Sequence, residues 1–227
     1  MSKNLIEIKN LRKEFKNNNL SIKVLNNVNI NIESGKLIAL VGPSGSGKST
    51  FLHLLALLDK PTEGKIKLCG SLTESLSENS RNKMVRENIS IIFQNNNLLS
   101  DFTALENVAI PLIIRDQEHK SSIKKASQIL NDVNLSHRLN HFPSDLSGGE
   151  QQRVAIARSI ASETKIILAD EPTGNLDHNT SKEVFSYFLK LKEKNKTVLI
   201  ATHNRDLARQ ADYTLRLSNG VIKRVNE

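Results

Sequence analysis

Nine consecutive residues, GPSGSGKST at positions 42–50, have the types and spacing of a phosphate-binding loop. They fit the pattern G-x-x-x-x-G-K-[ST]. The glycines allow successive backbone N–H groups to turn toward one point, and a following helix adds its positive N-terminal end there. Lys48 would reach the terminal phosphates, and the Ser49 hydroxyl would bind a bridging Mg²⁺ ion. The sequence therefore predicts a polyphosphate site formed by Gly42, Pro43, Ser44, Gly45, Ser46, Gly47, Lys48, Ser49 and Thr50.

Four further polar side chains each follow a short apolar segment: Gln94, Asp170, Glu171 and His203. Asp170 has the place of the acidic residue that completes the Mg²⁺ shell in phosphate-loop enzymes, and Glu171 could polarise an attacking water. His203 could donate to the terminal phosphate, and Gln94 could offer its amide oxygen to the metal. A Gln or His at a strand end is, taken alone, more often structural. The phosphate loop in the same chain favours the functional interpretation.

A parallel sheet would bring these side chains together. Residues 37–41 form an apolar segment of strand length before the loop, and the residues after it have a helical pattern. Apolar segments at 90–93, 166–169 and 197–201 predict further strands. Ligands of open parallel sheets bind beyond the carboxyl ends of the strands, so we expect one shared edge. This predicts an α/β fold with a phosphate-loop NTPase core.

The N-terminal part has a different pattern. Residues 5–8 mix apolar and polar positions and residues 28–32 alternate them strictly, which indicates half-buried strands in a small antiparallel layer. Phe15 lies between them in a polar stretch, and the residues alone favour a position at the edge of the core. At the other end, strands at 213–217 and 221–225 around Asn219-Gly220 predict a hairpin.

Residues from about 95 to 160 are rich in helical patterns and poor in strand patterns, which predicts a helical lobe inserted into one domain of residues 1–227. We expect helices at 103–107 and 121–133, separated by Pro111. Ser147 and Glu150 have the spacing of a capping box. Two glycines in a first turn destabilise a helix, so we expect another group to approach the bare backbone at 148–149.

Composition limits the class of protein. The chain has 227 residues, of which 38% are hydrophobic, and its longest apolar run, 51–58, is far shorter than the ~20 residues of a membrane-spanning helix. No apolar signal region follows the first residues, and a single cysteine, Cys69, forms no internal disulfide, so we expect a cytosolic protein. The formal charge of +8 comes from scattered Lys and Arg without interleaved aromatics, so nucleic acid is not an expected partner.

The order of these parts resembles the ATP-binding subunits of ABC transporters over essentially the whole chain. The specific element is LSGGEQ at 146–151, which is similar to the signature sequence of that family. The resemblance implies an ATPase coupled to transport, with ATP and Mg²⁺ as cofactors. It also implies that two copies pair head to tail, so that each ATP lies between one phosphate loop and the signature of the other copy. The signature residues that would then contact ATP are Ser147, Gly148, Gly149 and Gln151.

The same resemblance assigns roles to single residues. Phe15 becomes the adenine-stacking aromatic, which replaces the core-edge interpretation, and Gln94 becomes the glutamine of the Q-loop. Asp177 becomes the D-loop aspartate and His203 the switch histidine. Asn204 stands where Asp is common in the family.

Within the family, residues 98–108 and 53–62 resemble the ATPases of the lipoprotein-releasing system. FtsE-type division ATPases and MacB-type export ATPases share much of this pattern, including 174–177, and stay alternatives. A soluble ABC ATPase acting on ribosomes or DNA is a more distant one. The resemblance implies integral membrane permease subunits as partners, lipoprotein as indirect cargo, and a peripheral location at the cytoplasmic face of the bacterial inner membrane. Residues 95–107 are the expected surface for transmission to the permease.

Overall fold

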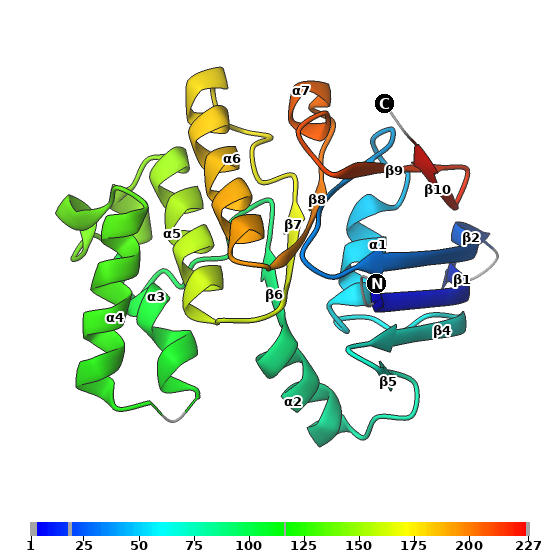
Figure 1. The fold of residues 1–227 in the computed structure, drawn as a ribbon, viewed down its shortest axis with the longest axis horizontal. Coiled ribbons are helices and arrows are strands. Elements are labelled where there is room, and N and C mark those ends of the chain that lie inside the picture. Colours follow the sequence, from blue (N-terminus) through cyan, green and yellow to red (C-terminus); the bar gives the residue numbers. More distant parts are fainter. Residues whose placement is uncertain (1–3, 18–19, 116, 226–227) are drawn as a thin grey trace.

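Figure 1 shows a computed structural model of the protein, which contains helices and two β-sheets. The structure describes residues 4–17, 20–115 and 117–225. Within these residues, the larger sheet has the strand order β10-β9-β3-β8-β7-β6. Its strands are β3 (Leu37–Val41), β6 (Ile89–Ile92), β7 (Ile166–Asp170), β8 (Thr197–Ala201), β9 (Tyr213–Ser218) and β10 (Val221–Val225). All neighbours are parallel except β9 and β10, which form the predicted hairpin. The parallel core that the apolar segments predicted is therefore present.

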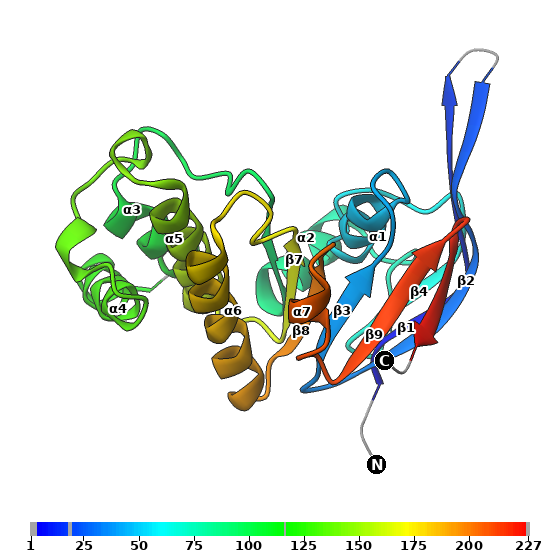
Figure 2. The ribbon, with the colours of Figure 1, turned by 90° about the horizontal axis from the view of Figure 1, so that it is seen from above.

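The smaller sheet has the order β2-β1-β4-β5 within the described residues. Its strands are β1 (Asn4–Asn17), β2 (Leu20–Glu33), β4 (Glu63–Leu68) and β5 (Ser71–Leu72), and all neighbouring pairs are antiparallel. The antiparallel layer was predicted, but β1 and β2 are longer than the apolar alternation indicated. They continue as a two-stranded ribbon that projects beyond the rest of the fold (Figure 2). Their polar ends pair with each other, so they need no buried face to form the ladder.

Helix α1 (Lys48–Leu55) lies between the two sheets. Its side chains Phe51 and Leu52 are fully buried in one cluster with Ile6 and Ile8 of β1 and with Leu168 of β7. The small sheet thus covers one face of the large sheet through α1. Since α1 begins at the end of the phosphate loop, this packing fixes the loop against both sheets.

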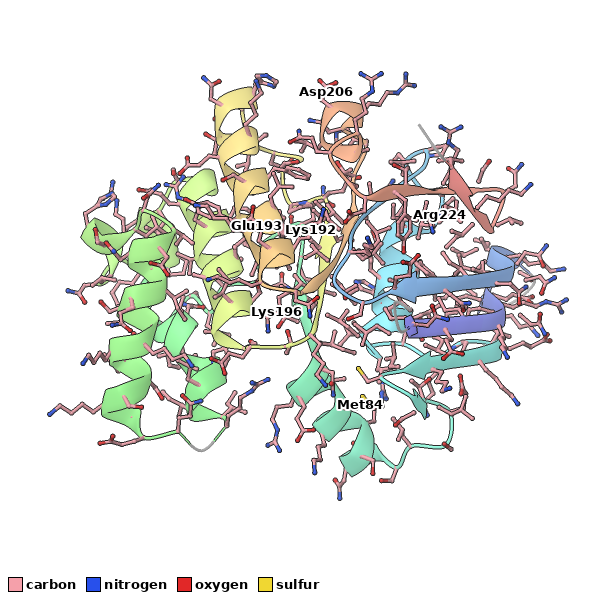
Figure 3. All side chains as sticks on the ribbon, viewed as in Figure 1. Met84, Lys192, Glu193, Lys196, Asp206 and Arg224 are labelled. Carbon is pink, nitrogen blue, oxygen red and sulfur yellow. The ribbon has the colours of Figure 1, made fainter. Side chains whose placement is uncertain are left out.

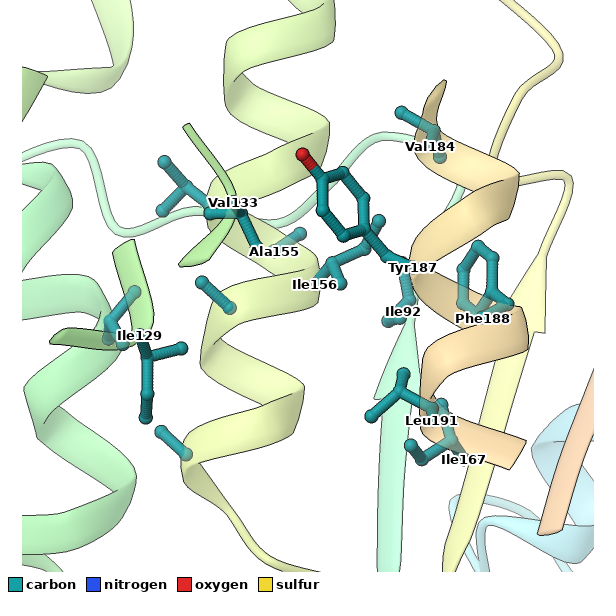
Figure 4. Packing of buried hydrophobic residues seen from close by; sticks show 14 of the residues in the cluster. Ile92, Ile129, Val133, Ala155, Ile156, Ile167, Val184, Tyr187, Phe188 and Leu191 are labelled. Carbon is teal, nitrogen blue, oxygen red and sulfur yellow. The ribbon is translucent and has the colours of Figure 1, made fainter. Parts of the chain in front are cut away.

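Helices cover the opposite face of the large sheet (Figures 1 and 4). Val184, Phe188 and Leu191 of α6 (His178–Glu193) pack toward Ile167 of β7 and Ile92 of β6 in a second apolar cluster. The remaining helices are α2 (Glu78–Asn88), α3 (Ala104–Ile113), α4 (His119–Asp132), α5 (Gly148–Ala161) and α7 (Arg205–Ala208), with short 3-10 turns at Ser136–Arg138 and Pro143–Asp145. The α/β fold class is confirmed.

The described elements between residues 95 and 160 are helical, but α3 runs through Pro111 instead of ending before it. The prediction of a break at Pro111 was wrong. Pro111 removes one i→i−4 hydrogen bond, and only Leu112 and Ile113 follow it in the helix. The buried side chains of Ala104, Val108 and Leu112 give the helix a continuous apolar face, and this packing outweighs the loss.

The expected transmission surface is also partly interior. Ala104 and Asn107 are almost fully buried, so the segment 95–107 is not free of core residues. The Asn107 side chain accepts from the Leu99 N–H at 2.9 Å and donates to the carbonyl oxygens of Leu99 and Phe102 at 3.1 and 2.9 Å. It therefore shapes the loop before α3, on which Leu99 and Phe102 are exposed.

Candidate functional site

The phosphate loop connects β3 to α1, as the motif requires. Gly47 has φ 103°, a conformation that other residues rarely adopt, and a Cβ at Gly42 would lie 2.5 Å from the carbonyl oxygen of Leu217. Lys48 folds back over the loop, and its ammonium donates to the carbonyl oxygens of Gly42 and Pro43 at 3.1 and 3.3 Å. The ammonium thus lies over the concavity in which the loop would hold phosphate.

A carboxylate that follows β7 reaches this ammonium and also contacts an imidazole that follows β8. Glu171 follows β7, and its Oε1 lies 3.7 Å from Lys48 Nζ. Its Oε2 accepts the backbone N–H of His203 at 3.3 Å and lies 2.9 Å from His203 Nδ1. Glu171 itself has φ 45°, and its N–H donates to the Ala201 carbonyl of β8. The structure therefore brings together Lys48, Glu171 and His203, as the strand-end argument predicted.

Asp170, the last residue of β7, is 6% exposed, and its Oδ1 has no hydrogen-bond partner among the described residues. A buried carboxylate oxygen without a partner is costly unless another group binds it. The buried Ser46 hydroxyl of the phosphate loop also has no hydrogen-bond partner among the described residues. The described residues contain no group of three His, Cys, Asp or Glu that could hold a metal alone. The donors fit Mg²⁺, which takes oxygen ligands from one or two protein side chains and from phosphate.

Gln94 follows β6, is exposed, and lines a groove with Glu171 and Gly174. The same groove receives Gly148 and Gln151 from the first turn of α5. Of the three predicted metal ligands, Ser49 and Gln94 are accessible and Asp170 is buried. Gln94 and Glu171 therefore line one groove at the strand ends where the metal is predicted.

The predicted capping box is present at α5. The Ser147 hydroxyl accepts the N–H of Glu150 at 3.3 Å, and a Glu150 carboxylate oxygen accepts the N–H of Ser147 at 2.8 Å. Gly149 also has a reason within the chain that the sequence did not reveal, since a Cβ there would lie 2.7 Å from the Thr180 methyl group. Gly148 has no such neighbour, because the nearest atom to its Cβ would be 4.0 Å away. The expectation of an external group therefore rests on Gly148.

The signature residue Gln151 and the D-loop residue Asp177 are engaged within the chain. The Gln151 side-chain amide donates to the carbonyl oxygens of Pro143 and Leu146 at 3.0 and 3.1 Å, which fixes the turn before α5. Asp177 caps α6 by accepting the N–H groups of Asn179 and Thr180. Helix α5 and helix α1 lie on opposite sides of β7 in both ribbon views (Figures 1 and 2). One chain therefore does not join its signature to its own phosphate loop.

Comparison with known proteins agrees with this geometry. The sequence profile described as ABC transporter matches residues 25–174. The chain belongs to the ABC transporter family.

Relatives within the family match nearly the full chain. The lipoprotein-releasing system ATP-binding protein LolD of Rickettsia bellii is 46% identical over 224 residues, 98% of this chain and 99% of the relative. LolD of Wigglesworthia glossinidia brevipalpis is 44% identical over 98% of this chain and 97% of the relative. The ATP-binding cassette MJ0796, solved as a dimer in a post-hydrolysis state with ADP and Pi, has a TM-score of 0.91 and 39% identity, covering 98% of this chain and 99% of that one. The resemblance predicted from the motifs is confirmed.

In this ABC protein, Phe15 is 45% exposed on β1 and does not belong to the core, so the core-edge interpretation was wrong. The Lys13 ammonium lies 4.7 Å from the centroid of its ring. Lys13 is 9% exposed and donates to Asp59 Oδ1 at 2.8 Å and to the Lys60 carbonyl at 2.9 Å. Sequence reasoning missed this buried lysine. The Lys13 ammonium lies over one face of the Phe15 ring, as cations do at aromatic side chains, so a stacking base would have to use the opposite face.

Glu150 links the signature helix to the preceding turn. Its Oε1 accepts from Arg138 Nε at 2.8 Å, and Arg138 Nη1 lies 3.1 Å from His141 Nε2. Burial alone would raise the pKa of Glu150, but the Ser147 N–H, the Arg138 guanidinium and the Ser147 hydroxyl together lower it to about 2. The capping box of this ABC protein thus depends on an ionised carboxylate.

Glu150→Gln is expected to lower the free energy of unfolding by about 1–2 kcal/mol at pH 7, because the charged partner of Arg138 is lost. A depressed pKa stabilises the folded state above the ordinary value of 4.5, and this contribution disappears as the pH falls from 4.5 toward 2. Urea unfolding at pH 7, 4.5 and 3 should show a wild-type advantage that is nearly full at pH 4.5 and clearly smaller at pH 3. An advantage that stays constant with pH would contradict the assignment.

Proposed function

We propose that this chain is the ATP-hydrolysing subunit of an ABC transporter complex that releases lipoproteins from the bacterial inner membrane. The observation that carries hydrolysis is the contact of Glu171 with both Lys48 and His203 at the end of the parallel strands, beside the unpartnered oxygen of Asp170. Similarity over nearly the full chain to proteins named for the lipoprotein-releasing system supports the cargo.

The residues have separate roles in hydrolysis. Bound Mg²⁺, held by Ser49, Gln94 and Asp170, would neutralise charge on the phosphates. Lys48 exchanges its loop carbonyls and Glu171 for phosphate oxygens when ATP binds. Glu171 then accepts a proton from the attacking water as the bond from the terminal phosphorus to the bridging oxygen breaks. His203, whose side chain is 69% exposed, holds Glu171 in place and donates to the departing phosphate.

The complete ATP site needs two copies of the chain in this proposal. Ser147, Gly148 and Gly149 line a groove with Arg138 and Asp177 that contains no phosphate-loop residue. The backbone N–H groups at the start of α5, with the positive end of the helix dipole, suit the terminal phosphate of an ATP held by a partner copy. A head-to-tail homodimer meets this requirement, and the solved MJ0796 structures are dimeric.

A membrane partner is the remaining part of the proposal. No helix in residues 4–17, 20–115 and 117–225 is long and apolar enough to cross a bilayer. We propose that integral membrane permease subunits of the LolC/LolE type bind this chain at the cytoplasmic face of the inner membrane. The exposed Leu99 and Phe102, which lie in the loop shaped by Asn107, are the proposed contact.

Purification from detergent-solubilised membranes tests the partner and the cargo. We expect the chain to copurify with an integral membrane permease, and lipoprotein in proteoliposomes to stimulate its ATPase at least about twofold. Addition of ATP should then release the lipoprotein from the membrane. Recovery with a division complex or an export permease, without response to lipoprotein, would favour the FtsE-type or MacB-type alternative. Recovery with ribosomes or DNA and no permease would contradict the proposal.

A further inference from the structure

Arg158 on α5 reaches across to the loop that follows Gln94. Its Nη1 donates to the Asn97 carbonyl and its Nη2 to the Asn96 carbonyl, both at 2.8 Å. Burial lowers the pKa of the guanidinium, which agrees with a charge partly withdrawn from solvent. The proposed hydrolysis mechanism does not use this partly buried cation.

The loop has the conformation that this contact requires. Asn96 and Asn97 have φ 58° and 46°, which is the left-handed region that Asn tolerates better than most residues. The Asn96 N–H donates to the Phe93 carbonyl at 3.0 Å, so the turn closes directly around Gln94 and Asn95. A turn of this kind leaves few backbone contacts of its own, and its carbonyl oxygens bond to Arg158 instead.

The same helix is fixed to the strand that precedes the loop. Ser90 of β6 has its hydroxyl 2.7 Å from that of Thr164, just beyond the end of α5, and donates to the Ser159 carbonyl at 3.5 Å. The C-terminal half of α5 is therefore bonded to β6 and to the loop after it. The N-terminal end of the same 14-residue helix begins at Gly148.

We propose that Arg158 is a positioning residue that fixes Gln94 relative to α5, so that the metal-ligand loop and the signature residues move as one unit. This rests on the proposed function, in which Gln94 contacts Mg²⁺ and the start of α5 contacts the partner's ATP. A displacement of α5 toward a partner copy then carries the Gln94 loop with it. The metal shell is complete only when the signature residues are in place.

The chemistry of arginine makes this contact specific. A planar guanidinium presents two parallel N–H donors to two acceptors, whereas a lysine ammonium offers a point charge on a flexible stem. Arg158→Lys keeps the charge and most of the buried methylene stem but loses the paired geometry. Arg158→Gln loses the charge as well. The two variants therefore separate the paired contact from the presence of a cation.

Magnesium titration of ATP hydrolysis by the full-length chain tests the proposal. We expect the half-saturating Mg²⁺ concentration to rise about tenfold in Arg158→Gln, equal to about 1.4 kcal/mol, and by a smaller factor in Arg158→Lys. The KM for ATP at saturating Mg²⁺ should stay within about twofold, since the phosphate loop and Phe15 are untouched. Amide hydrogen exchange at 95–98 should become faster in both variants. A loss of packing alone would lower thermal stability without changing the Mg²⁺ requirement.

Lys192→Gln is the matched control. Lys192 lies in the last turn of α6 (Figure 3), and its ammonium pairs with Asp212 at 2.8 Å. The variant loses a charged contact of the same length as the Arg158 hydrogen bonds, and this contact involves neither Gln94 nor α5. We expect its Mg²⁺ requirement and the exchange at 95–98 to equal those of the wild type.

The outcomes are distinct. If Arg158→Lys and Arg158→Gln fold and leave both the Mg²⁺ requirement and the exchange unchanged, the positioning role is wrong. If Arg158→Gln fails to fold, Arg158→Lys decides between the same two results. Gln94→Ala is measured beside them. If it leaves the Mg²⁺ requirement unchanged, the proposed role of Gln94 fails, and the exchange at 95–98 alone still decides whether Arg158 holds the loop.

Discussion

Glu171→Gln is expected to reduce the kcat for ATP hydrolysis about 1,000-fold while ATP still binds, because a general base contributes roughly 10²–10⁴. The amide keeps the size and one acceptor oxygen of the carboxylate, so it can still accept the His203 N–H, and the bond from the residue 171 N–H to the Ala201 carbonyl belongs to the backbone and is unchanged. It cannot take a proton from water. With hydrolysis stalled, the ATP-bound dimer should accumulate.

Single-turnover hydrolysis and size-exclusion chromatography with ATP measure the two effects. Glu163→Gln is the matched control, since Glu163 is an exposed carboxylate paired with Lys125 and touches no predicted site residue. It should hydrolyse ATP at the wild-type rate and show no extra dimer. Wild-type turnover by Glu171→Gln would remove Glu171 from the mechanism and leave His203 as the next candidate.

The sequence predicted those parts of the site whose structure depends on a few neighbouring residues. The phosphate loop, the strand before it and the polar residues at the ends of β6, β7 and β8 are each contained in a short segment. The pattern of a parallel sheet then determines where their ends meet. The contact between Lys48 and Glu171 spans more than 100 residues of sequence, yet it follows from the carboxyl ends of β3 and β7, which only β8 separates in the sheet.

Side chains that act across the fold could not be predicted in this way. Lys13 finds Asp59 and Arg158 finds Asn97 at sequence separations of 46 and 61 residues, between segments whose relative position no spacing reveals. Pro111 and Asn107 show the same limit in α3, where packing and one buried amide override a local signal. Tertiary contacts, and not propensity, determined each of these outcomes.

The two glycines of the signature have different structural reasons, which the sequence alone could not distinguish. Gly149 is small because Thr180 of α6 lies against it, whereas a Cβ at Gly148 would clash with no atom of the chain that the structure describes. Within one chain, a Cβ at 148 would make only an ordinary van der Waals contact, with the Leu176 side chain at 4.0 Å. The absence of a side chain there is explained if a phosphate approaches the first turn of α5 from a second copy, so Gly148 is the stronger support for the proposed dimer.

Lys48→Ala is expected to weaken ATP binding about 100-fold, since a charged hydrogen bond to phosphate contributes roughly 1.5–3 kcal/mol. Lys48→Ala weakens the binding of ATP, whereas Glu171→Gln slows its hydrolysis. The dissociation constant for ATP is therefore the quantity that should change in Lys48→Ala. Isothermal titration calorimetry with a nonhydrolysable ATP analogue measures it. Lys67→Ala is the control, because Lys67 pairs with Glu7 on the small sheet, away from the loop. Lys48 Nζ also lies 3.7 Å from Glu171 Oε1, so phosphate must displace a carboxylate to bind this ammonium. Glu171→Gln removes that competing carboxylate and should bind ATP at least as tightly as the wild type. Weaker binding by Glu171→Gln would show that the ion pair between Lys48 and Glu171 prepares the site for ATP instead of competing with it.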